Sequence, residues 1–517
     1  MAHHHLLDLA VEDQDNLMRI ISNLLLIMVL VPLFINAQSI NDAVNWSFEN
    51  ESGNSRYESM AGAFGALGGN LSALSSNPAS GAVFELSRFG VSLIINDNSI
   101  TSTYNNNQNT LNSGNSNYQA GLVYVFKNYG NGDLNKFSIG INFQSISNFN
   151  EEVKISGRSQ NSVDNFFLNN SSGVNVNNIS VGSNETVRGV YKWLGDNVGY
   201  YAQQAFLGYQ SYLLNYDSDK SSFYSLAKYD NGVSQDHQIF SNGFNNQASF
   251  NLSWQYKENF YWGINLNFND VLVEKELRHI ESNFDSDSPI TDIDFRNYLT
   301  TKGTGISVQG GLIYKIGTIR IGVSYSTPTY YKFEDILEQY IKTSSIDVQG
   351  VTYTDIVDPR ISNIYNYNFK SPSKLNFSVG SVINNMILIS ADVISKNYSK
   401  SKFEHQNNGV YNDLNSAIGR NLTNVIDYKI GTEIKLNQFS IRAGYKALNN
   451  PYKNGEKKYI TAQTFGLGYN FNSSILDFAI VNSKNNYNYQ LFDTGLTESA
   501  NINNKRLKIV LSYNIIF

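Results

Sequence analysis

The feature that most constrains the fold of this chain is an alternation of apolar and polar residues that recurs along its length. From Trp262 to Asn269, every even position is apolar and every odd position is Gly or Asn. Residues two apart share one face of a β-strand, so one face of such a run meets lipid or a core and the other meets water. We count about fourteen such runs. They start near Phe89, Ala120, Phe137, Phe250, Trp262, Ile306, Ile319, Leu375, Ile387, Tyr428, Phe439, Phe465, Leu476 and Leu507.

The links between these runs alternate in length. Short links occur at 257–258, 317–318, 384–385 and 437–438, whereas every other link is long, including the first, at about 97–117. Short turns on one side and long loops on the other are typical of an outer-membrane β-barrel. A soluble β-sandwich also alternates, but the number of runs and the pairing of short and long links favour the barrel. We therefore predict an all-β transmembrane barrel of about fourteen antiparallel strands over residues 88–517.

The composition argues against catalysis and nucleic-acid binding. The chain has no Cys, which removes disulfides, thiol nucleophiles and Cys-ligated metals. His237, His279 and His405 are dispersed over different links, and there is no G-x-S-x-G motif. With 16% charged residues and a net charge of −6, the chain has no dense basic run for nucleic acid. We predict no enzyme activity, no catalytic residue, no cofactor and no metal site.

Residues 18–37 have the three regions of a secretory signal peptide. Met18 and Arg19 form the basic start, an apolar run extends from Leu24 to Val31, and a small-residue site ends at Ala37. A membrane anchor is the alternative, but it needs about 20 apolar residues. Residues 1–17 are interpreted as an upstream extension from a misplaced start or a vector. Together with the barrel, this segment predicts the outer membrane of a Gram-negative bacterium, a monomer, and partners in outer-membrane lipid and the barrel-assembly machinery.

Residues 38–87, between this segment and the first run, have a different composition. They are rich in small residues, among them Gly62, Gly65, Gly68 and Gly69. The stretch is too apolar for a linker and too short for a domain, so it must be buried inside another part of the protein. We predict a hatch that plugs the barrel lumen.

The residues of this hatch carry a resemblance to a known family. A small-residue stretch that runs into Leu71-Ser72-Ala73-Leu74-Ser75-Ser76-Asn77-Pro78-Ala79, directly before the first strand, resembles the hatch of FadL-type outer-membrane channels. These channels carry long-chain fatty acids and aromatic hydrocarbons. The family motif corresponds to Asn77, Pro78 and Ala79. The sequences at 56–69 and 209–213 are similar to those of members from Bacteroidetes-like bacteria.

The resemblance implies passive uptake of a hydrophobic small molecule. The ligand is caught by extracellular loops, passes to a site in the lumen, and leaves sideways through a gap at a kinked third strand when the hatch moves. Here that strand would be Phe137 to Ile146, with Gly140 as the candidate kink, although an ordinary lumen-facing Gly explains this residue equally well. The alternative function is a FadL-like barrel that serves as a protein-interaction or secretion-system shuttle platform.

The alternation of side chains along each strand also assigns residues to the lumen. Arg442, Lys446, Arg320 and Lys374 point inward and are candidate ligand contacts. Acidic residues at 427, 433 and 477 point inward as well, so mutual neutralisation is the alternative.

Two further segments stand out. The link at about 147–246 is too long to lack structure, and its apolar stretches form either a surface that catches ligands or a lid. In the last run, the alternation that includes Tyr513 and ends at Phe517 resembles the signal read by barrel-insertion machinery.

Overall fold

The computed structural model describes residues 38–517 except 129, 131, 406–408 and 456–457. The expected signal peptide at 18–37 and the upstream extension at 1–17 lie outside the described residues.

The strands form one closed antiparallel barrel of fourteen strands, which confirms the predicted fold class. The first strand, β1 (Arg88–Tyr104), pairs along its length with the last, β21 (Ser499–Ile516), so the sheet has no free edge. Four barrel strands are interrupted and carry two labels each, among them the third, which continues from β3 as β4. In order, the others are β2 (Asn107–Lys127), β3 (Leu134–Asn148) with β4 (Glu151–Ser159), β7 (Val233–Tyr256), β8 (Phe260–Ser282), β9 (Ile290–Ile316), β10 (Ile319–Ser326) with β11 (Tyr330–Ile346), β13 (Asn363–Lys370) with β14 (Lys374–Ile383), β15 (Ile387–Asn397) with β16 (Lys402–Glu404), β17 (Asn424–Leu436), β18 (Phe439–Asn449), β19 (Lys458–Asn470) and β20 (Ser474–Gln490).

The alternation in sequence becomes a division between the outside and the inside of the barrel. In β8, Trp262, Ile264 and Leu266 are exposed on the outer surface, whereas Asn265 and Asn267 are buried in the lumen. An apolar band on the outside of a closed barrel is the surface that faces lipid. No helix among the described residues is long and apolar enough to cross a membrane.

The first link differs from the prediction of a long loop at 97–117. β1 and β2 pair without interruption from Arg88↔Val123 to Tyr104↔Asn107, and a two-residue turn at Asn105 and Asn106 joins them. Both turn residues have positive φ, which Asn tolerates in tight hairpins. The strands were missed because this part is rich in Asn, Ser and Thr on both faces, so it lacks the alternation that lipid imposes.

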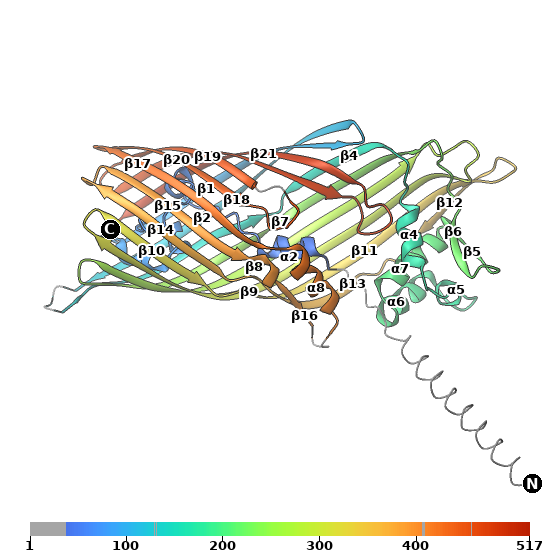
Figure 1. Cartoon of the computed structure of the whole chain (residues 1–517), viewed down its shortest axis with the longest axis horizontal. Coiled ribbons are helices and arrows are strands. Elements are labelled where there is room, and N and C mark those ends of the chain that lie inside the picture. Colours follow the sequence, from blue (N-terminus) through green and yellow to red (C-terminus); the bar gives the residue numbers. More distant parts are fainter. Residues whose placement is uncertain (1–37, 129, 131, 406–408, 456–457) are drawn as a thin grey trace, which may run out of the picture.

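The long link has structure of its own, as expected from its length. β4 and β7 extend far into the predicted range of 147–246, and four helices occupy the rest at the end of the barrel opposite the C-terminus (Figure 1). These helices are α4 (Asp164–Ser171), α5 (Val176–Ile179), α6 (Val187–Asn197) and α7 (Tyr200–Gln210), and a hairpin of β5 (Leu214–Asp217) and β6 (Ser222–Ser225) follows. β12 (Thr352–Val357) pairs with β11 at the same end.

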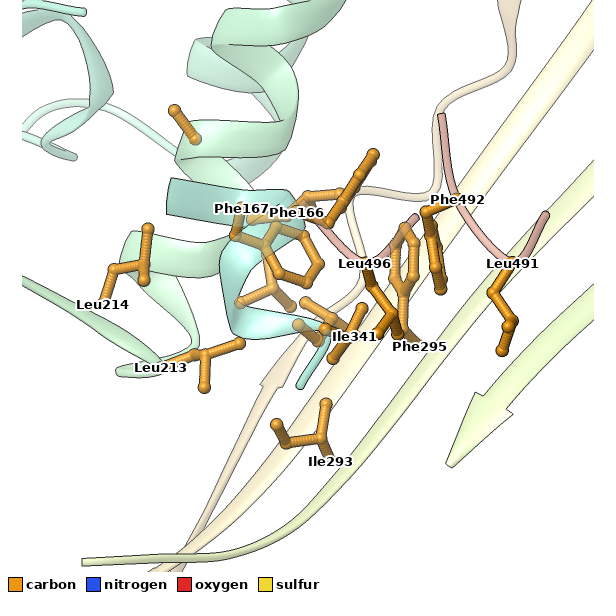
Figure 2. Close-up of a cluster of buried hydrophobic side chains, with 14 of the residues drawn as sticks. Phe166, Phe167, Leu213, Leu214, Ile293, Phe295, Ile341, Leu491, Phe492 and Leu496 are labelled. Atoms are coloured by element: carbon orange, nitrogen blue, oxygen red, sulfur yellow. The ribbon is translucent and has the colours of Figure 1, made fainter. Parts of the chain in front are cut away.

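Aromatic packing fixes this helical segment to the barrel wall. The rings of Phe166 and Phe167 in α4 lie 6.0 and 5.1 Å from the ring of Phe295 in β9, and Phe166 lies 5.0 Å from Phe492 (Figure 2). The predicted catching stretches are largely buried in this cluster, as Tyr191 and Phe206 show. The segment at 160–232 is therefore packed against the barrel, and we call it the lid below.

Candidate functional site in the lumen

The hatch lies inside the barrel (Figure 1) and has four short elements. They are α2 (Ile40–Ser47), α3 (Ser55–Ser59) and the 3-10 helices η1 (Ser72–Leu74) and η2 (Pro78–Val83). Ser39 begins α2 with a capping box that Asp42 completes, and Asn54 caps α3. Polar side chains of the wall bind the hatch backbone: Thr464 Oγ1 donates to Ser59 O at 2.8 Å.

The Asn77-Pro78-Ala79 motif joins three parts of the site. Asn77 has the extended backbone that a following proline favours, with φ −150° and ψ 114°. Its side-chain oxygen accepts from Ala79 N at 3.1 Å and so caps η2. Its amide nitrogen donates to Gly65 O at 2.7 Å and to Leu312 O of β9 at 3.0 Å. One side chain thus links the motif to the small-residue stretch and to the barrel wall.

The small-residue stretch lies directly against the wall. A Cβ at Gly65 would lie 1.9 Å from Ser378 Oγ in β14, which leaves no space for any side chain. Gly62, Gly68 and Gly69 adopt positive φ, the left-handed backbone that favours glycine.

The candidate cations fall into two groups, and the first consists of two arginines of the wall, Arg442 and Arg320. Arg442 Nε lies 2.7 Å from Glu433 Oε1, and Arg442 Nη1 lies 2.7 Å from Asp477 Oδ1. Arg56 of the hatch also binds Glu433, at 2.6 Å. Arg320 donates to Leu67 O of the hatch at 2.6 Å. Arg320 therefore binds the hatch directly, whereas Arg442 binds Glu433, the carboxylate that also holds Arg56 of the hatch.

The second group is a cluster of lysines opposite an extended hatch segment, Phe48–Ser52. Lys374 Nζ lies 2.7 Å from Glu49 Oε2 and 3.2 Å from Glu51 Oε1, and Lys396 Nζ lies 2.9 Å from Glu49 Oε2. Lys446 Nζ donates to Asn50 Oδ1 at 2.9 Å. Burial acts to raise the pKa of Glu51, but the nearby charges of Lys374 and Lys429 outweigh it and lower the pKa below its ordinary value.

A small cavity of about 30 Å³ lies between this segment and the wall. Lys374, Lys396, Lys429 and Lys446 line it together with Glu49, Glu51, Glu58 and Asp427. Lys374 and Lys446 were predicted to point inward, whereas Lys396 and Lys429 were not. The alternation of side chains could have identified Lys429, which lies between the outward-facing Tyr428 and Ile430. Lys396 lacks this signal, because its neighbours Ser395 and Asn397 are polar.

The third strand is regular at Gly140, the candidate kink, which agrees with the alternative of an ordinary lumen-facing Gly. Gly140 pairs regularly with Val123 and Asn251, and a Cβ there would lie 3.1 Å from Leu74 of the hatch. The register instead shifts between Ser145 and Ser147. The ladder between β2 and β3 ends at Ala120↔Phe143, just before this shift.

Two histidines that appeared dispersed in the sequence lie opposite each other in β7 and β8. His237 Nδ1 lies 3.1 Å from His279 Nδ1, and His279 Nε2 lies 3.0 Å from Glu281 Oε1. Glu281 is fully buried and also accepts from Val163 N at 2.9 Å and from the Ser162 hydroxyl, where the lid begins. Glu281 thus fixes the start of the lid. No group of three or more His, Asp or Glu suited to hold a metal ion occurs among the described residues.

At the end of the last strand, Tyr513 and Phe517 are exposed on the outer surface. Phe517 N donates to Ser87 O at 3.0 Å, so the terminal residue lies beside the start of β1.

Comparison with known proteins finds the same architecture in solved structures. No protein-family model and no curated protein sequence matches this chain. A Pseudomonas aeruginosa FadL homologue aligns with a TM-score of 0.53 and 12% identity, over 91% of this chain and 99% of its own. The P. putida toluene transporter TodX aligns at 0.48 and 14%, over 91% and 99%, and the CymD monoaromatic hydrocarbon channel at 0.46 and 12%, over 90% and 98%. These similar structures are transport channels or their homologues rather than enzymes, and the chain has the fold of the FadL-type outer-membrane channels.

Proposed function

We propose that this chain is an outer-membrane channel for passive uptake of hydrophobic small molecules, such as long-chain fatty acids or aromatic hydrocarbons, with lateral release controlled by the hatch. The observation that carries this proposal is the interrupted wall beside β3. Strand pairing with β2 ends at Ala120↔Phe143, and beyond it the hatch forms a bridge between Ser52 and Ser145. Unpaired strand edges are costly in lipid, so an edge covered by a separate segment supports a gate at this place.

Side chains connect the two strands beyond the end of the ladder. Asn148 Nδ2 donates to Asn115 Oδ1 at 3.1 Å, and Asn109 Nδ2 donates to Ser156 Oγ at 3.0 Å. Such amide and hydroxyl contacts separate at lower cost than a ladder of backbone hydrogen bonds. A ligand that leaves sideways would pass between β2 and β3 at this level.

The test is a disulfide across the proposed exit, which is feasible because the chain has no native Cys. We expect oxidised N115C/N148C to lose most uptake of a labelled fatty acid or aromatic hydrocarbon in cells without their own transporter, and reduction to restore it. L122C/I141C is the matched control, since Leu122 and Ile141 already pair in the intact ladder. Full uptake by oxidised N115C/N148C would contradict lateral release, and no uptake of any ligand by the native chain would contradict the channel.

The second candidate function, a protein-interaction platform, is favoured by apolar residues exposed outside the barrel. Val348, Tyr353 and Ile356 around the β11–β12 hairpin are 97%, 51% and 58% exposed. If the hairpin binds a protein partner, V348D/I356D should abolish that binding and leave uptake unchanged. Loss of uptake in this variant would instead place the hairpin on the path of the ligand.

A further inference from the structure

Six positively charged side chains surround the mouth of the lumen at the end of the barrel that holds the short turns. Short turns mark the periplasmic side of an outer-membrane barrel, and the C-terminus lies at this end (Figure 1). Each of the six lies near the end of a strand, next to an apolar residue that faces outward, so the alternation of side chains directs the cation inward. They are Arg88 in β1, Lys127 in β2, Lys136 in β3, Lys315 in β9, Arg320 in β10 and Lys435 in β17.

Four of these cations form two like-charged pairs across neighbouring strands. Lys127 lies directly opposite Lys136 in the ladder of β2 and β3, and Lys315 lies directly opposite Arg320 in the ladder of β9 and β10. Like charges in directly opposed positions destabilise a sheet. Strand pairing alone therefore disfavours both pairs, and each pair calls for an anion beside it.

The first pair has such an anion. Glu85, at the end of the hatch, lies 2.6 Å from Lys136 Nζ and 3.6 Å from Lys127 Nζ, so the two lysines share one carboxylate. The side chain of Glu85 is 72% exposed. A carboxylate can thus occupy this place while it remains in contact with the solvent at the mouth.

The second pair lacks a carboxylate. Within the part of the chain that the structure describes, neither Lys315 nor Arg320 forms an ion pair, and Arg320 donates instead to the Leu67 carbonyl at 2.6 Å. Lys435 is exposed and forms no ion pair among these residues either. The guanidinium of Arg88 lies 5.4 Å from the centre of the Phe84 ring, and its Nε is buried without a hydrogen-bond partner.

Other carboxylates near this end are bound elsewhere or lie in the turns. Glu433 and Asp477, deeper in the lumen, bind Arg442. Asp133 lies 3.9 Å from Lys257, and Glu258 is exposed in the turn after β7. The mouth therefore keeps an excess of positive charge in a chain whose net charge is −6.

The shape of this surface indicates what it binds. The charges of Lys136 and Arg320 are close enough to repel each other, as are those of Lys435 and Arg88. None of the six cations lines the cavity of about 30 Å³. An open ring of cations suits an extended chain with several carboxylates, whereas a small anion needs a concave site. Lipid head groups fit less well, because the cations face the lumen.

We propose that the periplasmic mouth of the barrel docks an acidic segment of a periplasmic protein. A carboxylate of this segment takes at Lys315 and Arg320 the place that Glu85 takes at Lys127 and Lys136. Lys435 and Arg88 extend the same surface. The inference concerns a partner on the periplasmic side and depends neither on uptake nor on lateral release.

The test is binding of fluorescein-labelled deca-glutamate to the purified full chain in a non-ionic detergent, measured by fluorescence anisotropy. We expect saturable binding that weakens several-fold as NaCl rises from about 50 to about 200 mM, because salt screens exposed charges. Deca-glutamine, which has the same length without charge, should not bind. Heat-modifiable migration on gels verifies that each variant is a folded barrel.

The variants test both pairs. K315Q/R320Q should weaken binding roughly tenfold, since two charged contacts are lost. K315Q alone, which keeps the contact of Arg320 with Leu67, should weaken it in the same direction. K192Q/K220Q is the matched control, because it removes two exposed lysines from the lid at the opposite end. E85Q leaves the first pair without its carboxylate, so it should tighten binding several-fold.

No binding of deca-glutamate at low salt, or equal binding by K315Q/R320Q and K192Q/K220Q, would overturn this inference. Weaker binding by E85Q would contradict the role given to Glu85. Full displacement of the peptide by inorganic phosphate at low millimolar concentration would also overturn the inference, because the mouth would then be a site for small anions.

Discussion

At the scale of single residues, close contact between the hatch and the wall depends on positions that tolerate no added atom. Gly65 is the tightest of these, because a Cβ would lie 1.9 Å from Ser378 Oγ and 2.8 Å from Asn376 Nδ2. We predict that G65A makes the free energy of packing of the hatch against the wall less favourable by about 1–3 kcal/mol, because the added methyl group overpacks the contact. Limited proteolysis of residues 38–87 measures this, and S378G in the same chain should restore protection. G310A is the matched control, since its Cβ would meet no atom within 4 Å.

Asn77 and Pro78 are the second residue-scale case. Their substitution by Ala removes three hydrogen bonds of the Asn77 side chain, to Gly65 O, to Leu312 O and from Ala79 N, and also the restriction on the backbone. We predict that N77A/P78A folds as a normal barrel, because strand pairing does not depend on the hatch, but changes uptake of a hydrophobic ligand. Uptake equal to the native chain for every ligand would show that the hatch is not a gate.

At the scale of elements, Glu281 in β8 holds the lid to the barrel. Its carboxylate accepts from Val163 N at 2.9 Å and from Gln235 Nε2 at 2.8 Å, besides Ser162 and His279. We predict that E281Q loosens the lid by about 1–3 kcal/mol, because an amide NH2 then faces donors. Hydrogen exchange should rise over 160–232 and stay unchanged in the strands of the membrane. E276Q, on the outward face of the same strand, is the control, and equal exchange in both variants would rule out this anchor.

The strands show what sequence alone predicts and where it stops. Runs such as Trp262–Asn269 were visible because lipid and a polar lumen impose opposite polarity on neighbouring residues. The strands at 96–117 were not, because Asn, Ser and Thr occupy both of their faces. Glu49 and Glu51 were also missed as partners of Lys374 and Lys396. Their pairing joins residues more than 300 positions apart, which no local pattern encodes.

At the scale of the whole molecule, closure of the barrel depends on its last strand. Phe517 makes one backbone hydrogen bond, to Ser87, and the residue is 57% exposed on the outer surface. Deletion of Phe517 should therefore cost only about 1 kcal/mol of stability. We predict a larger loss in the heat-modifiable fraction inserted in cells than in the fraction refolded in detergent. F471A, which alters an exposed aromatic residue at a short turn, should insert normally. Normal insertion without Phe517 would contradict its role as an assembly signal.

The closure of β1 on β21 also sets an order of events in folding. The hatch precedes every strand in the chain, yet Ser55 binds Ser512, 457 residues later. A ring that closes between its first and last strands encloses whatever lies within it at that moment. The hatch must therefore enter the nascent barrel before its final seam forms, or later pass through an open end. Contacts of such long sequence separation slow folding. The hatch is synthesised before every strand and is thus among the last segments to reach its native surroundings.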